Sequence, residues 1–184
     1  MPDGGVRFTR AGYHRLVEGG LLGPDPRVEL LNGEIVMMSP IGPWQGALVR
    51  RLTRFFIKNL PDSIECSAQL PIIVENHSEP EPDIALVRSR DDDYQQEHPS
   101  PVDAVLLVEV SQSSLRIDLG KKLHVYAAAG VSEYWVVDIE QKRVVVHREP
   151  FGQEYRSVES FSSGESIAPL AAPMCELELD WLFH

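Results

Sequence analysis

The spacing of hydrophobic and polar positions predicts which segments of the chain are strands and which are helices. In RVELLNGEIVMMS (residues 27–39), two apolar runs flank Asn32-Gly33, a dipeptide that strongly favours the turn of a β-hairpin. Over residues 44–60, apolar residues recur every three or four positions, which predicts a helix with one buried face. We therefore expect a β-hairpin near the N-terminus, followed by a long amphipathic helix.

The rest of the chain contains mainly strand patterns. Apolar runs predict strands over residues 67–75, 82–87, 104–111, 133–139, 143–149 and 154–161. A further helix is expected after Ser113-Ser114 and should end near Ala129, with Gly130 as its C-cap. This order of elements predicts an α/β fold in which a mixed β-sheet is flanked by helices.

Length and turn signals indicate one main domain. The 184 residues are enough for a single domain with its own core. The glycines and prolines of GLLGPDP (residues 20–26) interrupt the pattern. We expect an N-terminal segment over residues 1–26, with a short helix near residues 13–18, and a single domain over residues 27–184.

Composition narrows the class of protein. The chain has 28 acidic and 17 basic residues, a net charge of −11, which disfavours a surface built for nucleic acid but allows a small basic channel. Its two cysteines, Cys66 and Cys175, have neither metal-ligand spacing nor the pattern of a disulfide framework. No apolar run approaches the length of a membrane span. We expect a cytoplasmic protein without a membrane partner.

Two acidic residues stand out because they lie in or beside apolar strands. Glu109 lies inside the strand expected over residues 104–111, where an ionised carboxylate needs a cation, a proton or a metal. Asp83 begins the preceding strand, directly after Pro82. On adjacent strands the two carboxylates could hold Mg²⁺. The alternative is structural: Asp83 only begins a strand, and Glu109 pairs with a basic residue.

The helix after residue 114 carries a lysine on its apolar face. At 100° per residue, Lys122 falls among Leu115, Tyr126 and Ala129, whereas Lys121 points about 100° away. Lys122 is therefore expected to point inward, toward the sheet that carries Glu109. Its role is either catalytic or structural, as a bridge to a carboxylate (Asp118 or Glu109) or as a snorkelling side chain.

The predicted helix over residues 44–60 carries the most basic local patch of the chain. Its polar face shows Arg50, Arg51, Arg54 and Lys58. Such a stripe is either a solvated helix face or a track for a nucleic-acid backbone. Under the second interpretation Arg50 and Arg54 bind substrate.

Several ordered segments together resemble one known family. VELLNGEIVMMSP, EPDIAL, LVEVSQSS and DLGKKLHVYAAAGVSEYWVVD look like the Uma-type family of restriction endonucleases, within the PD-(D/E)XK nuclease superfamily. The resemblance runs from about Glu29 to Phe183. It implies a restriction-endonuclease-like core and cleavage of DNA phosphodiester bonds with a divalent metal, Mg²⁺ or Mn²⁺.

The resemblance also implies roles for particular residues. Pro82-Asp83 matches the PD element, Glu109 matches the acid of (D/E)XK, and the backbone carbonyl of Val110 is implied as a further metal ligand. The lysine position of that motif holds Ser111, which departs from the superfamily. The lysine of this family lies on the following helix instead, at the position of Lys122.

Two further positions follow from the same resemblance. Glu29 matches an acidic position of the family that could bind a second metal or orient a water; the alternatives are an exposed strand residue, or Glu34 in the same role. Gln45 stands where relatives often have histidine, so it is implied near the substrate but cannot shuttle a proton.

The sequence thus predicts a metal-dependent DNA endonuclease with Asp83, Glu109, Lys122 and Glu29 at its active site. The alternative is a catalytically inactive binding or structural module with the same fold. A homodimer is the simplest arrangement for cutting both strands of a duplex.

Overall fold

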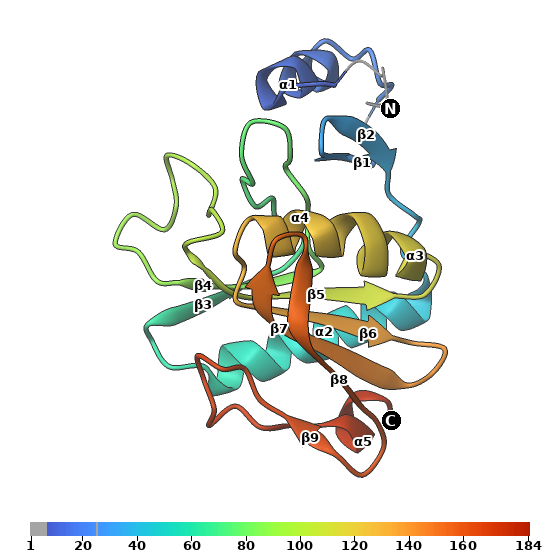
Figure 1. The fold of residues 1–184 in the computed structure, drawn as a ribbon, viewed down its shortest axis with the longest axis vertical. Coiled ribbons are helices and arrows are strands. Elements are labelled where there is room, and N and C mark those ends of the chain that lie inside the picture. Colours follow the sequence, from blue (N-terminus) through green and yellow to red (C-terminus); the bar gives the residue numbers. More distant parts are fainter. Residues whose placement is uncertain (1–6, 25) are drawn as a thin grey trace.

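A six-stranded sheet forms the centre of the computed structural model, which describes residues 7–24 and 26–184. Its strand order is β3-β4-β5-β6-β7-β8, so each strand pairs with its neighbour in the sequence. The bounds are β3 Ile64–Ser67, β4 Ile84–Arg88, β5 Ala104–Ser111, β6 Glu133–Asp138, β7 Arg143–Phe151 and β8 Glu154–Phe161. Only β5 and β6 run parallel, and the helical crossover between them packs on the sheet (Figure 1). The sheet is mixed, as the sequence predicts.

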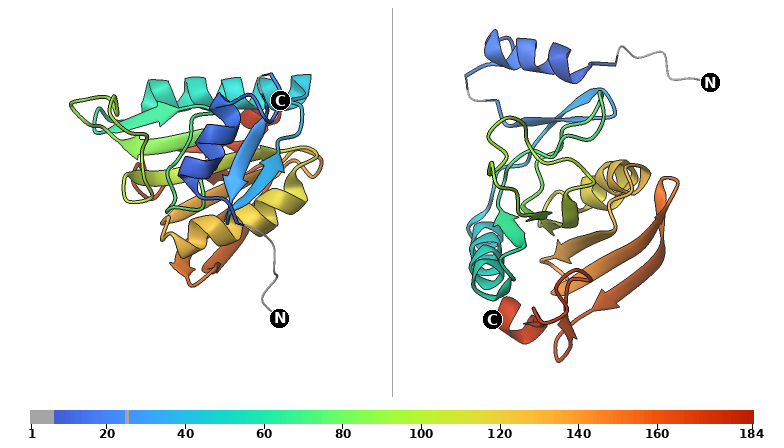
Figure 2. Two further views of the ribbon diagram at one scale, coloured as in Figure 1. Left: turned by 90° about the horizontal axis from the view of Figure 1, so that it is seen from above. Right: turned by 90° about the vertical axis from the view of Figure 1, so that its left-hand side faces the viewer.

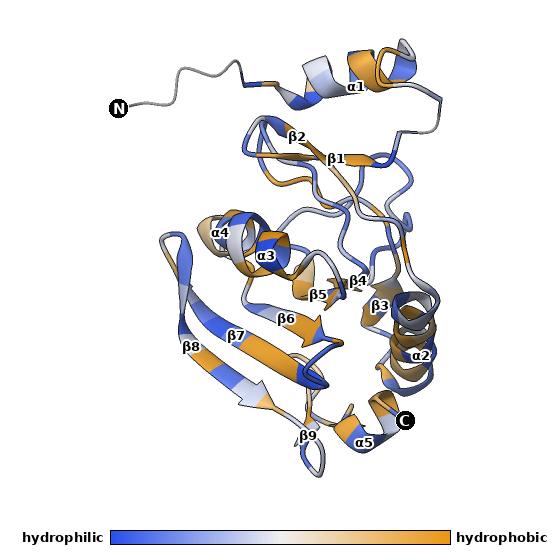
Figure 3. Cartoon of the chain, turned by 90° about the vertical axis from the view of Figure 1, so that its right-hand side faces the viewer, coloured by the Kyte–Doolittle hydropathy of each residue, from blue (hydrophilic) through white to orange (hydrophobic). Residues whose placement is uncertain are grey.

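Helices cover both faces of the sheet (Figure 3). Helix α2 (Pro43–Asn59) packs through Leu48, Leu52 and Phe56 on the face that carries Val108 and Val110. The helical segment over residues 115–128 packs on the opposite face. Because side chains alternate along a strand, β5 points Leu107, Glu109 and Ser111 toward that second segment.

The second helical segment is not a regular α-helix. It consists of α3 (Leu115–Ile117), a single π turn (Asp118–Lys122) and α4 (Leu123–Ala128). The Leu123 N–H donates to the carbonyl of Asp118, five residues back, and the Tyr134 hydroxyl donates 3.0 Å to the same carbonyl. Single π turns inside α-helices often lie at functional sites. The sequence of residues 115–128 predicts a helix but gives no sign of the π turn.

A small antiparallel hairpin sits above α3 and α4 (Figure 1). Strands β1 (Val28–Leu31) and β2 (Glu34–Met37) are joined through Asn32 and Gly33, which have φ of 51° and 78°. Both residues therefore adopt the left-handed conformation that this type of tight turn requires. The predicted hairpin is present with the expected turn.

Helix α1 (Arg10–Glu18) packs on the outer side of this hairpin (Figure 2). Tyr13 is buried with Val28 and Leu30, and its hydroxyl donates 2.9 Å to the carbonyl of Val28. The contact ties the N-terminal helix to the hairpin.

One strand prediction was wrong in its position. Strand β3 covers Ile64–Ser67, whereas most of residues 67–75, predicted as a strand, is irregular and contains only an isolated bridge at Val74. Pro71 lacks a donor for a strand ladder, and Gln69 has a φ of 54°. Ile72 and Val74 are buried in the core beneath α4, so this segment has the apolar residues of a strand without forming one.

The C-terminal residues pack in the same hydrophobic core as α2. Strands β9 (Ser166–Ile167) and β10 (Leu177–Glu178) form a two-stranded pair, and α5 (Leu179–Leu182) follows. Trp181 of α5 lies 5.8 Å from Phe55 of α2 between ring centroids. Within the described residues, every helix is too short or too polar to cross a bilayer.

Candidate functional site

A small pocket of about 40 Å³ lies where the hairpin, the start of α2, the segment before β4, the end of β5 and the π turn meet. Five carboxylates line it: Glu29, Glu81, Asp83, Glu109 and Asp118. The cations that line the same pocket are Arg27 and Lys122. Acidic side chains thus outnumber cations at this point.

Asp83 is held in place through both of its carboxylate oxygens. Its Oδ2 accepts a 2.9 Å hydrogen bond from the Val110 N–H, and its Oδ1 accepts one of 3.2 Å from the Gln69 amide. Pro82 ends the preceding irregular segment, so the aspartate stands at the entrance to β4. Asp83 therefore lies against the end of the neighbouring strand β5.

The backbone of Val110 points to the same side as Asp83. In an extended strand the N–H and C=O of one residue point the same way, and the Val110 N–H meets Asp83. The carbonyl of the next residue, Ser111, accepts from Ile139 on the β6 side. The Val110 carbonyl is thus directed toward Asp83, where the sequence predicted a metal-ligating oxygen.

Glu109 and Lys122 form a buried ion pair. The Lys122 ammonium lies 3.0 Å from Glu109 Oε1, and both side chains are 5% exposed. The Tyr126 hydroxyl donates 3.1 Å to the same oxygen. Both donors therefore engage Oε1 of Glu109.

Glu29 brings a second carboxylate to the same lysine. Its Oε2 lies 2.9 Å from Lys122 Nζ and accepts a 3.2 Å hydrogen bond from the Glu81 N–H. Glu29 is 3% exposed, so its interpretation as an exposed strand residue was wrong. The rival Glu34 is exposed and pairs with Lys121 outside the pocket. Strand β1 is buried along its whole length, whereas Glu34 lies at an exposed end of β2.

The two neighbouring lysines point in different directions, as the helical spacing predicts. Lys122 is 4% exposed, whereas the Lys121 side chain is 52% exposed. The alternative in which Lys122 forms an ion pair with Asp118 is not supported, because the hydrogen-bond partners of the Asp118 carboxylate are serines. Its Oδ2 accepts hydrogen bonds of 2.6 Å from both Ser111 and Ser114.

Ser111, at the lysine position of the (D/E)XK pattern, therefore holds Asp118. Asp118, Glu81, Tyr126 and Gln69 join the site without having been predicted as site residues. Sequence signals existed for two of them: Asp118 precedes Lys122 by one helical turn, and Glu81 directly precedes Pro82. Tyr126 has the spacing of an ordinary core residue, and Gln69 lies in a segment that was predicted as a strand.

Burial and like charges raise the pKa values of three of these carboxyls. Desolvation raises the pKa of Glu109 well above its ordinary value; Lys122 opposes the shift, and Asp118, Asp83 and Glu29 add to it. Desolvation also raises the pKa values of Asp118 and Glu81. Burial alone would lower the pKa of Lys122, but Glu109, Glu29 and Asp118 outweigh it and raise this pKa. Glu109, Asp118 and Glu81 therefore hold a proton more readily than an ordinary carboxyl group does.

The donor chemistry of the pocket fits a divalent cation with oxygen ligands. Mg²⁺ needs only one or two carboxylates when water and a substrate phosphate complete its octahedron. Asp83, Glu109 and the Val110 carbonyl supply such oxygens from adjacent strands. Across residues 7–24 and 26–184, no group of three or more His, Cys, Asp or Glu side chains is spaced to ligate one ion. The fit thus depends on two carboxylates and a carbonyl.

The predicted substrate-binding residues lie on α2. Gln45, in the first turn of this helix, is 9% exposed and lines the acidic pocket. Arg50 and Arg54 are exposed one and two turns further along and lie outside this pocket. The site thus contains Gln45 but not the two arginines.

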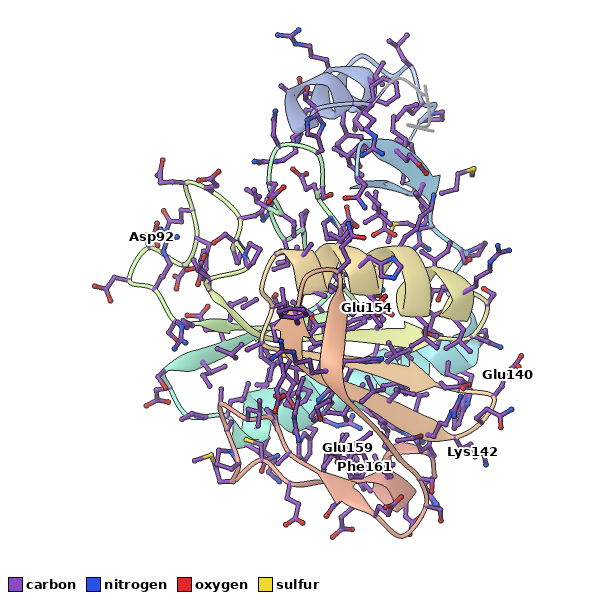
Figure 4. The ribbon with its side chains drawn as sticks, in the orientation of Figure 1. Asp92, Glu140, Lys142, Glu154, Glu159 and Phe161 are labelled. Atoms are coloured by element: carbon purple, nitrogen blue, oxygen red, sulfur yellow. The ribbon has the colours of Figure 1, made fainter. Side chains whose placement is uncertain are left out.

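Trp135 and Tyr134 are completely buried in the core, so base stacking by these rings is excluded. The loop that carries the acidic run 91–93 projects beyond β3 and β4, and Figure 4 shows Asp92 at its outer end. Asp92 pairs with Arg90 at 2.9 Å. Neither feature contributes to the pocket.

Comparisons with known proteins agree with this architecture. The family model Uma2, described as "Putative restriction endonuclease", matches residues 11–180. A crystal structure from Anabaena variabilis, described as "a putative nuclease belonging to DUF820", superposes with a TM-score of 0.72 at 16% identity. The superposition covers 96% of this chain and 97% of that one. A comparison with curated proteins finds no match. The predicted fold class is confirmed by this structural likeness.

Proposed function

The chain belongs to the Uma2 family of restriction-endonuclease-like proteins, and on this premise we propose that it hydrolyses DNA phosphodiester bonds with the help of a divalent cation. The observation that carries the proposal is the meeting of Asp83, Glu109 and Lys122 in one buried acidic pocket. Two carboxylates on adjacent strands and one lysine are the groups that such chemistry needs.

In this proposal Asp83, Glu109 and the Val110 carbonyl hold Mg²⁺ or Mn²⁺. The bound cation would polarise the scissile phosphate and lower the pKa of a coordinated water. Lys122 orients the attacking water and stabilises the negative charge that develops on the phosphate. Because Lys122 and Tyr126 both donate to Glu109 Oε1, a cation would compete with these donors for the Glu109 carboxylate.

The basic face of α2 suits the path of the DNA backbone. Arg50, Arg54 and Lys58 are exposed, and none forms an ion pair with a residue in the described part of the chain. These three residues border an open groove that ends at Gln69, the residue whose amide donates to Asp83. Gln69 therefore links the groove beside the arginines to Asp83 of the proposed cation site.

Removing these arginines should weaken DNA binding in a salt-dependent way. We expect the double variant Arg50→Ala/Arg54→Ala to bind duplex DNA about tenfold more weakly near 0.1 M salt, with a shallower dependence of log Kd on log salt. Fluorescence anisotropy at several salt concentrations measures both quantities. Arg15→Ala is the control, because Arg15 is exposed on α1, which the hairpin separates from the sheet and α2 (Figure 1). Equal binding by the double variant and the wild type would show that the DNA takes another path.

The decisive experiment for the proposed function combines cleavage with thermal unfolding. Incubation of mixed DNA substrates with Mg²⁺ or Mn²⁺ should yield cleavage products that EDTA abolishes. A cation that binds only the folded state also raises Tm, by about 5–10 °C at roughly 100 times its Kd for a chain of this size. If neither cation shifts Tm nor supports cleavage, Lys122 is instead a structural counter-ion, and the chain is an inactive module with the nuclease fold.

A two-fold dimer would supply two active sites for the two strands of a duplex. We propose this homodimer together with the nuclease function. Sedimentation of the protein with and without DNA measures its oligomeric state and so tests the proposed homodimer.

A further inference from the structure

The Lys122 ammonium is shared between two carboxylates that come from different parts of the fold. Glu109 reaches it from the central strand β5, at 3.0 Å, and Glu29 reaches it from the hairpin strand β1, at 2.9 Å. The three side chains are each about 5% exposed or less. Two carboxylates thus face one ammonium, so this group of three contains one more acid than base.

Each carboxylate is also fixed by a partner other than the lysine. The Tyr126 hydroxyl holds Glu109 Oε1, and the Glu81 N–H holds Glu29 Oε2. Neither glutamate therefore depends on the lysine alone for its place. Lys122, by contrast, is bonded to both acids at once, and its flexible four-carbon stem would let the ammonium keep one of them when the other turns away.

We infer that Glu29 is a positioning residue that retains the Lys122 ammonium when Glu109 turns to a bound cation, an inference that rests on the proposed cation site. In the cation-free protein the ammonium contacts Glu109 and Glu29 together. When the cation takes Glu109, the ammonium stays beside Glu29 and remains at the edge of the site.

The electrostatics of the pocket explain why a second glutamate is needed. Without Glu29, a cation at Glu109 would leave the lysine charge buried beside another positive charge and without a partner, which is costly in a desolvated site. With Glu29 present, the displaced ammonium keeps a carboxylate at hydrogen-bonding distance. Glu29 should thus favour cation binding through the lysine rather than by ligating the cation itself.

The chain offers a matched control for this arrangement. The neighbouring lysine, Lys121, pairs with the other glutamate of the hairpin, Glu34, but both side chains are more than half exposed. This second ion pair joins the same two elements outside the pocket. Replacing Glu34 changes the charge of the hairpin by the same amount without touching the buried group.

The test is a thermodynamic cycle on Mn²⁺ affinity, measured by isothermal titration calorimetry. The proteins are the wild type, Glu29→Gln, Lys122→Met, the double variant and Glu34→Gln. We expect Glu29→Gln to bind Mn²⁺ about tenfold more weakly than the wild type, the size of a coupling between residues of one network. Lys122→Met should bind more tightly, because the competing charge is gone, and Glu34→Gln should bind like the wild type.

The double variant decides the role of Glu29. If Glu29 acts through the lysine, Glu29→Gln costs about threefold or less when Lys122 is already methionine. If the cost stays about tenfold in that background, Glu29 acts on the cation directly and the inference is overturned. A wild type that binds no Mn²⁺ would instead overturn the proposed cation site itself, so the two failures are distinguishable.

Thermal unfolding curves measured in EDTA check that each variant is folded. Should Lys122→Met fail to fold, a crystal structure of the wild type soaked in Mn²⁺ takes its place. We expect Lys122 Nζ to keep its contact with Glu29 and to lose its contact with Glu109. Mn²⁺ bound to a Glu29 oxygen, or an unchanged contact between Lys122 and Glu109, would overturn the inference.

Discussion

Replacing Lys122 by alanine is expected to lower the rate of DNA cleavage by about 10²-fold or more, the usual cost of losing a group that stabilises developing charge. Its ammonium lies in the acidic pocket, 3.0 Å from Glu109, and in the proposed mechanism it stabilises the charge on the phosphate. Single-turnover cleavage with saturating Mg²⁺ measures the chemical step apart from substrate binding.

Lys121→Ala is the control for this experiment. Lys121 precedes Lys122 in the same π turn but is half exposed and pairs with Glu34 outside the pocket. Its removal should leave the rate near that of the wild type. A silent Lys122→Ala, or a damaging Lys121→Ala, would remove the proposed catalytic lysine from the mechanism.

Asp83→Asn should abolish metal-dependent cleavage, by at least about 10²-fold, while leaving the fold intact. The substitution removes a ligand charge, and even the partners of metal ligands typically account for about 10- to 100-fold in affinity or activity. Asparagine keeps a carbonyl oxygen that can accept the Val110 N–H, so packing and strand pairing should survive. Cleavage rate and Tm in EDTA, measured on the same preparation, separate the two effects.

The matched control for Asp83→Asn is Asp92→Asn, because Asp92 lies on the exposed loop between β4 and β5, remote from the pocket (Figure 4). It makes the same chemical change without touching the site. Wild-type cleavage by Asp83→Asn would show that this aspartate only begins a strand. A large loss of Tm would show that its hydrogen bonds serve the fold more than a cation.

The elements that carry the site could largely be predicted because their signals are local. The hairpin depends on Asn32-Gly33, and the central strand depends on an apolar run, interrupted by Glu109, that matches β5 at both ends. The inward direction of Lys122 followed from its spacing relative to neighbouring apolar residues. These patterns reflect backbone geometry and burial within one element, which a sequence records directly.

The family could also be predicted, since several ordered segments resemble it together, and the match over residues 11–180 confirms it. The roles of Asp83, Glu109, Lys122 and Glu29 in catalysis stay predictions. Local patterns were misleading where burial occurs without regular structure. The apolar residues around Pro71 resemble a strand but fill the core from an irregular segment.

What the sequence by itself determined about this protein is therefore the order of its elements, its family and the acids that interrupt its strands. Only the tertiary structure decided that Glu29, and not its weaker rival Glu34, is buried against Lys122, because both glutamates lie on strands of the hairpin. It also decided that Ser111 holds Asp118 and that the helix contains a π turn. These features depend on contacts between segments far apart in the chain. Their energies arise from desolvation and charge pairing, which the spacing of residues along the sequence does not reveal.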